Sequence, residues 1–341
     1  MEEVDKMSHR LRTCGAAAVL LLLLTLLSSC GQPTVPDETA TDYNQYIPSH
    51  GVTAYTKDLY IFFDSGRLFY VGRSQPSQLF PLCFQADCDH KNSSCTAWLN
   101  TPSRSIYAAG DNLYYIDADK DAKPALYRMD LSGGGRELVK SLNILNEESW
   151  PGISSLGYSF RVYGSYLAIE LNLLNEDSWQ HKIYLTGIDG KDEGVFLFGE
   201  EGDSDKSYIA IEFRENWLFV TEKNAADGTN TLWGYNFTTQ EAVPLVEGWD
   251  ISNCFTVQDG ILYWAVTGDG VYSMDMEKKS VTKHRSFDPV LEYGAAAYDD
   301  QYLYLTNAIR YMDSQGTVPA EERGVKVYDL QGNLQQFIPV P

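Results

Sequence analysis

One pattern of short apolar segments recurs along residues 51–341. Each copy starts at a leucine followed by apolar or aromatic residues, and the six leucines are Leu59, Leu113, Leu167, Leu218, Leu262 and Leu303. They are 54, 54, 51, 44 and 41 residues apart. Periods of this size are typical of solenoids and propellers, in which each repeat buries its apolar face against the next one.

Every repeat contains more than one strand. A second apolar-aromatic pair follows each leucine after a turn, at Leu68-Phe69, Leu126-Tyr127, Ile183-Tyr184, Leu232-Trp233, Val271-Tyr272 and Val327-Tyr328. With one strand in front and a weaker one behind, each repeat holds four short strands, as a propeller blade does. We therefore predict an all-β fold, a β-propeller of six four-stranded blades. The alternative is a pair of unrepeated β-sandwiches, and the regular alternation of the aromatic strands argues against it.

The predicted connections between strands differ in length. If the strands of a blade are named A to D from the centre outward, the long connections are all of the B–C type (117–124, 171–181, 222–230, 307–324) or the D–A type (83–103, 143–152). Both types leave a blade at the same face. Long loops on a rigid scaffold are where binding sites concentrate, so we predict that this face binds a ligand.

Two of these connections contain nearly the same nine residues. Leu142–Trp150 and Leu171–Trp179 match at seven of nine positions, and each ends in a tryptophan. The carboxylates that accompany the tryptophans are Glu147, Glu148, Glu176 and Asp177. An aromatic ring beside acceptors suits a sugar ring or a cationic group, so these six residues form the predicted ligand site. Alternatively, the two loops pack on each other with both tryptophans turned inward.

A cluster of metal-ligating residue types lies in the 83–103 connection. Cys83, Cys88, His90 and Cys95 have the ligand types of a Cys₃His zinc site, although the paired Cys-x-x-Cys spacing of zinc ribbons is absent. A disulfide is the alternative, because an exported chain meets oxidants. Three loop cysteines leave one without a partner, and this odd number favours a structural zinc ion.

The N-terminus has the layout of an export signal. Lys6, Arg10 and Arg12 precede an apolar run that is too short to span a bilayer, and the run ends in Leu27-Ser-Ser-Cys30-Gly. This ending resembles the bacterial lipobox, which implies that Cys30 becomes a lipid-modified, palmitate-bearing N-terminus.

These features divide the chain into three parts. We predict a lipoprotein signal peptide over 1–29, the lipidated Cys30 with a flexible tether over 30–50, and the propeller over 51–341. Within the tether, Tyr43–Ile47 either completes the last blade or leaves the ring to close by packing alone. The predicted location is the outer face of the cell membrane, where the lipid anchor makes the membrane a partner.

Charge narrows the possible partners. The chain of 341 residues has 26 Lys and Arg against 47 Asp and Glu, and its net charge is −21. Phosphate binding needs clustered cations, so a nucleic-acid partner is excluded. The apolar content of 44% is far above that of disordered chains.

The cysteine loop also carries a family resemblance. Leu79–Cys83, Cys88-Asp-His90 and Cys95-Thr-Ala, followed by tyrosine-rich blades, resemble a group of uncharacterised lipoproteins of Gram-positive anaerobes with TolB-like or DUF5050-like propeller repeats. The resemblance implies a propeller and a surface location. It implies no activity and no catalytic residue.

Two functions remain. The first is a surface-anchored module whose long-loop face binds a glycan, a peptide or a protein partner. The second is an extracellular hydrolase or lyase that acts on glycans through carboxylates. The sequence contains no nucleophile elbow, phosphate loop or zinc-protease motif, which favours the binding module over the enzyme.

Overall fold

The computed structural model describes residues 53–99, 105–175, 178–189, 194–199, 205–248, 255–288, 291–292, 295–299, 301–307 and 320–339. The chain divides into two compact units, Met1–Val35 and Pro36–Pro341, and all described residues belong to the second. The predicted signal peptide, Cys30, the tether and Tyr43–Ile47 lie outside the described residues. In the part that is described, no helix is long and apolar enough to cross a membrane.

The predicted six blades are present as six four-stranded antiparallel sheets, each made of four consecutive strands. The first three sheets, numbered in chain order, are β1 (Thr53–Tyr55), β2 (Leu59–Asp64), β3 (Arg67–Gly72), β4 (Leu79–Pro81); β5 (Ile106–Ala109), β6 (Asn112–Ala118), β7 (Pro124–Asp130), β8 (Glu137–Ser141); and β9 (Ile153–Tyr163), β10 (Tyr166–Asn175), β11 (Ser178–Gly187), β12 (Val195–Phe198).

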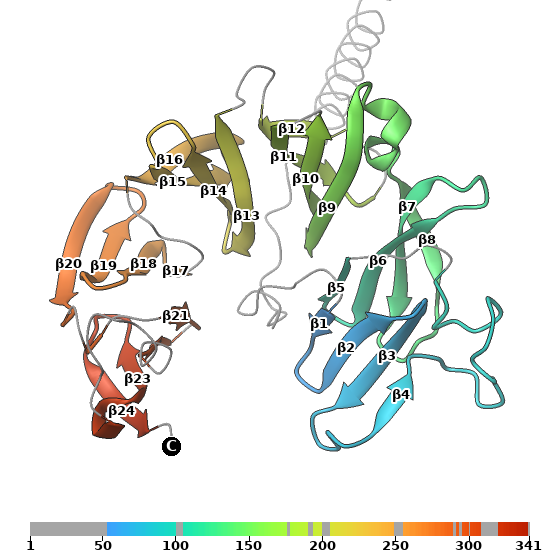
Figure 1. The fold of residues 1–341 in the computed structure, drawn as a ribbon, viewed down its shortest axis with the longest axis horizontal. Helices are drawn as coiled ribbons and strands as arrows, with labels where there is room; N and C mark the ends of the chain where they lie inside the picture. The colour runs from blue at the N-terminus through green and yellow to red at the C-terminus, as the bar shows by residue number, and fades with distance from the viewer. Residues whose placement is uncertain are drawn as a thin grey trace, which may run out of the picture. The chain divides into compact units, whose positions relative to one another are not determined.

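The remaining three sheets follow the same plan. They are β13 (Lys206–Arg214), β14 (Trp217–Asn224), β15 (Asn230–Asn236), β16 (Glu241–Glu247); β17 (Phe255–Gln258), β18 (Ile261–Val266), β19 (Gly270–Asp275), β20 (Ser280–Ser286); and β21 (Ala295–Tyr298), β22 (Tyr302–Thr306), β23 (Gly324–Asp329), β24 (Leu334–Pro339). Figure 1 shows the strands of each sheet side by side in chain order, from blue for β1 to red for β24.

The first strand of each sheet is the inner one. β1 contacts β5, and β5 contacts β9, although these strands belong to three different sheets. The apolar cores between neighbouring sheets cover the side chains of the second strands, and Leu113, Leu167, Leu218, Leu262 and Leu303 are fully buried. The recurring leucine of the sequence is therefore a core residue of the second strand in five blades, whereas Leu59 of blade 1 is partly buried.

Five apolar cores hold the six sheets together, one between each consecutive pair. Ile61 of sheet 1 shares a core with Leu113 of sheet 2, and Phe219 of sheet 4 shares one with Trp264 of sheet 5. The sheet 2–3, 3–4 and 5–6 interfaces have cores of the same kind. Within the described ranges, no core cluster joins sheet 6 to sheet 1, and sheet 6 reaches four strands without Tyr43–Ile47.

The connections differ in part from the prediction. The segment 171–181, predicted as a long loop, instead continues β10 to Asn175 and starts β11 at Ser178. Its residues pair in register from Leu171↔Lys182 to Asn175↔Ser178, so cross-strand hydrogen bonding extends the sheet where a loop was expected. The D–A connections 82–105 and 142–152 and the B–C connection 307–323 are long, as predicted. The B–C connections predicted at 117–124 and 222–230 are shorter than expected, because the strands leave only 119–123 and 225–229 between them.

Candidate functional site

The connection after β4 is fastened to β3 at its base. The amide of Leu82 donates to the carbonyl of Leu68 at 2.9 Å, and the amide of Leu68 donates to Ala97 at 2.8 Å. The amide of Leu99 donates to Gly66 at 3.0 Å. These bonds bring residues 82–83 and 95–99 to the same strand, so Cys83 and Cys95 meet although eleven residues separate them.

The structure brings all four predicted metal ligands together. One ligand atom from each of Cys83, Cys88, His90 and Cys95 lies within 4.8 Å of the others, and Nδ1 of His90 is 3.3 Å from Sγ of Cys95. His90 has a left-handed backbone with φ of 55°, which turns the chain back between Cys88 and Cys95. Arg67 of β3 donates a hydrogen bond of 3.3 Å to the carbonyl of His90.

The donor set fits a thiolate-binding metal. Zn–S and Zn–N bonds of about 2.3 and 2.0 Å put the ligand atoms of a tetrahedral site roughly 3.3–3.8 Å apart, so small side-chain movements close this cluster around an ion. The cluster could bind a metal, and its residues do not identify which one. Leu82, Cys95, Ala97 and Leu99 also belong to the core between sheets 1 and 2, so closing the loop supports packing.

The thiols of the cluster differ in their acidity. Partial desolvation raises the pKa of Cys83, but hydrogen bonds from Thr96 and Gln85 outweigh it and lower that pKa to about 6. Burial, together with the neighbouring thiols, raises the pKa of Cys95 to about 12. A second thiolate beside the first is unfavourable unless a cation neutralises both, so this arrangement ionises fully only around a metal.

The first tryptophan of the predicted ligand site is part of the molecular packing. Trp150 follows two 3₁₀ turns, η2 (Asn143–Leu145) and η3 (Glu147–Ser149), and its indole nitrogen donates 2.8 Å to the carbonyl of Ile144. Its ring meets Phe196 edge-on at 5.9 Å, and it is partly buried against the core between sheets 2 and 3. Glu147 and Glu148 are exposed.

The second tryptophan is presented to solvent. Trp179 is 51% exposed and lies opposite Leu174 near the end of the β10–β11 hairpin. Side chains alternate along a strand, so Trp179 is on the side of β11 that carries Ile183, which packs toward sheet 4. Trp150 packs toward sheet 2, so the two rings lie over opposite faces of sheet 3. Glu176 and Asp177 lie outside the described residues.

The face of sheet 3 that carries Trp179 also carries polar residues that the sequence did not single out. Asn172 pairs with His181 across β10 and β11, and Glu170 is two residues before Asn172 on the same face. Glu170 accepts long hydrogen bonds of 3.5 Å from Ser159 and 3.4 Å from Asn172. Desolvation raises the pKa of Glu170 to about 7, against opposing effects of Asn172, Arg161 and Ser159.

These residues have the elements of acid–base chemistry. Burial lowers the pKa of His181, and neither its Nδ1 nor the Oδ1 of Asn172 has a hydrogen-bond partner among the residues that the structure describes. A carboxyl group with a pKa near neutrality can donate and accept protons at physiological pH. The only sequence signal was a polar alternation at 170 and 172 within an apolar strand, and half-exposed strands show this alternation without any site.

Fold and contacts together define a six-bladed β-propeller with a cysteine–histidine cluster in the connection from blade 1 to blade 2. The structure resembles a prolyl endopeptidase with a TM-score of 0.52 and 11% identity over 85% of this chain. The chain covers 41% of that enzyme, so it spans about two fifths of the enzyme's length.

Other similar structures have lower scores. An oligogalacturonate lyase in complex with manganese has a TM-score of 0.42 and 14% identity, and the match covers 78% of this chain and 75% of the lyase chain. TolB from Acinetobacter baumannii has a TM-score of 0.37 and 13% identity, and the match covers 81% of this chain and 61% of the TolB chain. No protein-family model and no curated protein sequence matches the chain.

Proposed function

We propose that the protein is an extracytoplasmic binding protein, lipid-anchored through Cys30 to the outer face of the cell membrane. Its propeller holds a glycan, peptide or protein ligand at the face where the B–C and D–A connections emerge. The lipobox-like sequence supports the anchor, and the long connections support the choice of face. A propeller scaffold is compatible with this role and with enzymatic roles, so only the side chains distinguish between them.

The observation that carries this proposal is the exposed ring of Trp179. It is 51% exposed on a hairpin of two ten-residue strands, so a large apolar surface is held in water by a rigid support. Exposed aromatic side chains of this kind are typical of the centre of a binding surface. Trp150 has a packed ring and a bonded indole nitrogen and lies over the other face of sheet 3, so it is left out of the proposed binding surface.

A binding measurement with matched variants tests this proposal. The full chain in detergent micelles is applied to arrays of immobilised polysaccharides and peptides, and the best signal is titrated. We expect Trp179→Ala to weaken binding at least tenfold, because a central aromatic contact is worth about 2 kcal/mol or more. Leu334→Ala on β24, a residue that is also 51% exposed, is the control and leaves binding unchanged. Equal binding by Trp179→Ala contradicts the proposed site.

We also propose that the cysteine–histidine cluster holds a structural zinc ion. Zinc suits three thiolates and one imidazole, and the closed set of four protein ligands leaves no open position for catalysis. Metal content and free thiols are measured on protein purified without added metal. We expect near-stoichiometric zinc, lost in Cys88→Ser and kept in Asp87→Asn, an exposed residue of the same loop. Absence of metal, with one free thiol instead of three among Cys83, Cys88 and Cys95, would identify a disulfide instead.

The second candidate function is a carboxylate-dependent hydrolase or lyase that acts on glycans. It is favoured by Glu170, whose pKa of about 7 suits a general acid or base. Release of reducing or unsaturated ends from the polysaccharides bound on the arrays is the assay. We expect Glu170→Gln to abolish such release while ligand capture persists. If wild-type protein releases no product from a polysaccharide that it binds, this function is rejected.

A further inference from the structure

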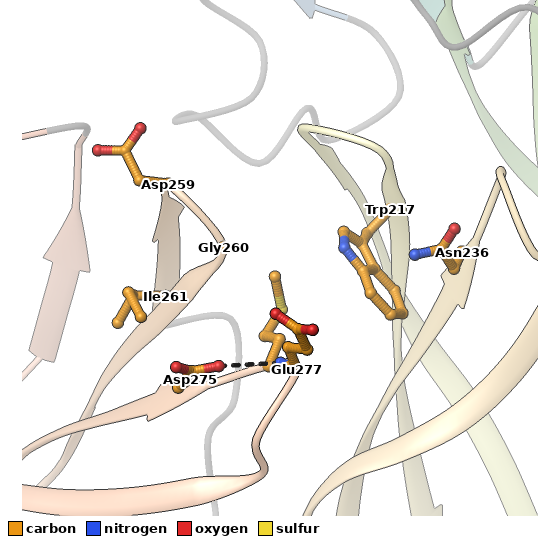
Figure 2. A pocket seen from close by; sticks show the side chains of 8 residues that line it. Trp217, Asn236, Asp259, Gly260, Ile261, Asp275 and Glu277 are labelled. Atoms are coloured by element: carbon orange, nitrogen blue, oxygen red, sulfur yellow. Dashed lines mark hydrogen bonds between the residues drawn. The ribbon is translucent and has the colours of Figure 1, made fainter.

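A pocket of about 390 Å³ lies between sheets 4 and 5, at the edge where the A–B and C–D turns emerge. The B–C turns, including the turn of the β10–β11 hairpin, lie at the opposite ends of the strands. Figure 2 shows its lining side chains converging from both sheets, with the indole of Trp217 on one side and Ile261 and Asp275 on the other. The volume lies within the range of small-molecule sites in proteins.

Contacts between the two sheets hold the pocket walls in place. Both carboxylate oxygens of Glu215, in the A–B turn of sheet 4, accept from the amide of Gly260 at 3.3 and 3.2 Å. Lys279 of sheet 5 donates 2.9 Å to the carbonyl of Pro244 in sheet 4. The two turns that border the pocket are therefore linked across the interface.

The ring of Trp217 packs against the backbone of a neighbouring strand. Gly234 of β15 lies directly beneath it, and a Cβ atom at Gly234 would be only 2.8 Å from the indole carbon Cε3. The absence of a side chain lets the indole lie against the strand. Trp217 is half-buried, and its indole nitrogen makes no hydrogen bond within the described ranges, so part of the ring remains available to a ligand.

Three carboxylate residues, Asp259, Asp275 and Glu277, line this pocket, and they differ in their partners. Asp275 forms an ion pair with Lys278, whose hydrogen bond lowers the pKa of Asp275. Asp275 also accepts from the backbone amide of Glu277 at 3.1 Å, as the dashed line in Figure 2 shows. The carboxylates of Asp259 and Glu277 form no ion pair or hydrogen bond with the residues that the structure describes. Lys278 also interacts electrostatically with Glu277, so the three carboxylates at the pocket outnumber this one lysine.

We infer that this pocket binds a small organic ammonium ion, such as a quaternary or primary amine on a short carbon body. A cation over an indole ring gains roughly 0.5–2 kcal/mol, and carboxylates at the rim add a complementary field. The apolar wall of Trp217 and Ile261 would contact the carbon body of the ligand. A bare metal ion fits less well, because these three carboxylates do not form a metal-ligand cluster within the described ranges.

This inference is independent of the function proposed above, since it uses different residues at the other edge of the sheets. Calorimetric titration of the full chain in detergent micelles uses choline as the probe and 3,3-dimethyl-1-butanol as its uncharged counterpart. We expect choline to bind and the neutral alcohol to bind at least tenfold more weakly. Equal binding of both compounds, or binding of neither, overturns the inference.

Variants separate the pocket from nonspecific attraction by an acidic protein. Asp259→Asn combined with Glu277→Gln removes two exposed charges without touching the core, and we expect at least a tenfold loss of choline affinity. Trp217→Leu should cause a similar loss. Asp111→Asn, an exposed aspartate in the A–B turn of sheet 2, is the matched control with unchanged affinity. Choline affinity that is the same in the double variant and in the control contradicts the site.

Discussion

Two segments of nearly identical sequence adopt different structures in this protein. Leu142–Trp150 forms two successive 3₁₀ turns after the outermost strand of sheet 2, whereas Leu171–Trp179 continues the hairpin of β10 and β11. The first copy puts its tryptophan into the packing between sheets, and the second exposes its tryptophan to solvent. Nine residues that match at seven positions therefore do not determine their own conformation.

The neighbouring strands explain the difference. The second copy continues β10, which pairs with β9 on one side and β11 on the other, so every added residue gains cross-strand hydrogen bonds. The first copy follows β8, which is the edge of its sheet and pairs only with β7. Pro151 and Gly152, with φ of 84° at the glycine, then turn the chain into β9. Tertiary pairing overrides the weak local preference of the segment.

The largest expected difference between the copies is in stability. Trp150→Ala should lower the free energy of unfolding by about 3 kcal/mol, because a packed ring and its hydrogen bond to Ile144 are lost. Trp179→Ala should change it by less than about 0.5 kcal/mol, because the ring is exposed. Urea denaturation followed by circular dichroism measures both. Similar losses in the two variants would show that the hairpin tryptophan is packed as well.

The strand that carries the second copy also carries Glu170, whose raised pKa makes folding depend on pH. The folded pKa of about 7 exceeds the unfolded value near 4.5, so folding favours the protonated carboxyl group. This stabilisation is complete below pH 4.5 and is lost as the pH rises through 7, by up to about 3 kcal/mol.

A glutamine at this position isolates that contribution. We expect Glu170→Gln to be more stable than the wild type at pH 8 and to lose most of the advantage at pH 4.5. Denaturation at a series of pH values measures the difference in unfolding free energy between the variant and the wild type. If the difference in unfolding free energy between Glu170→Gln and the wild type stayed constant across this pH range, the raised pKa of Glu170 would be contradicted.

The smallest expected effect comes from making the copies identical. Ile144→Leu with Glu148→Asp turns the first copy into the second, and we expect less than about 1 kcal/mol of change because the apolar replacement conserves volume. Hydrogen exchange should still distinguish the 3₁₀ turns at 143–145 and 147–149 from the strand residues 171–175 and 178–179. Strand-like protection appearing in the first segment would mean that these two positions, and not the context, select the structure.

The sequence by itself determined the class of fold and the number of blades. The recurring leucines predicted the second strand of every sheet, because a strand that is covered on both faces needs apolar residues wherever the blade is located. Cys83, Cys88, His90 and Cys95 could also be predicted as a cluster, because they lie within one connection and the chain needs only to fold back on itself.

Only the tertiary structure decided which side chains are available for binding. Trp150 and Trp179 are equivalent in sequence, and their burial differs because one meets sheet 2 and the other extends past its neighbours. The pocket beside Trp217 joins residues of two sheets, and Glu170 owes its pKa to burial between strands. Contacts between distant residues depend on packing and register, which local patterns do not encode, so these features could not be predicted from the sequence.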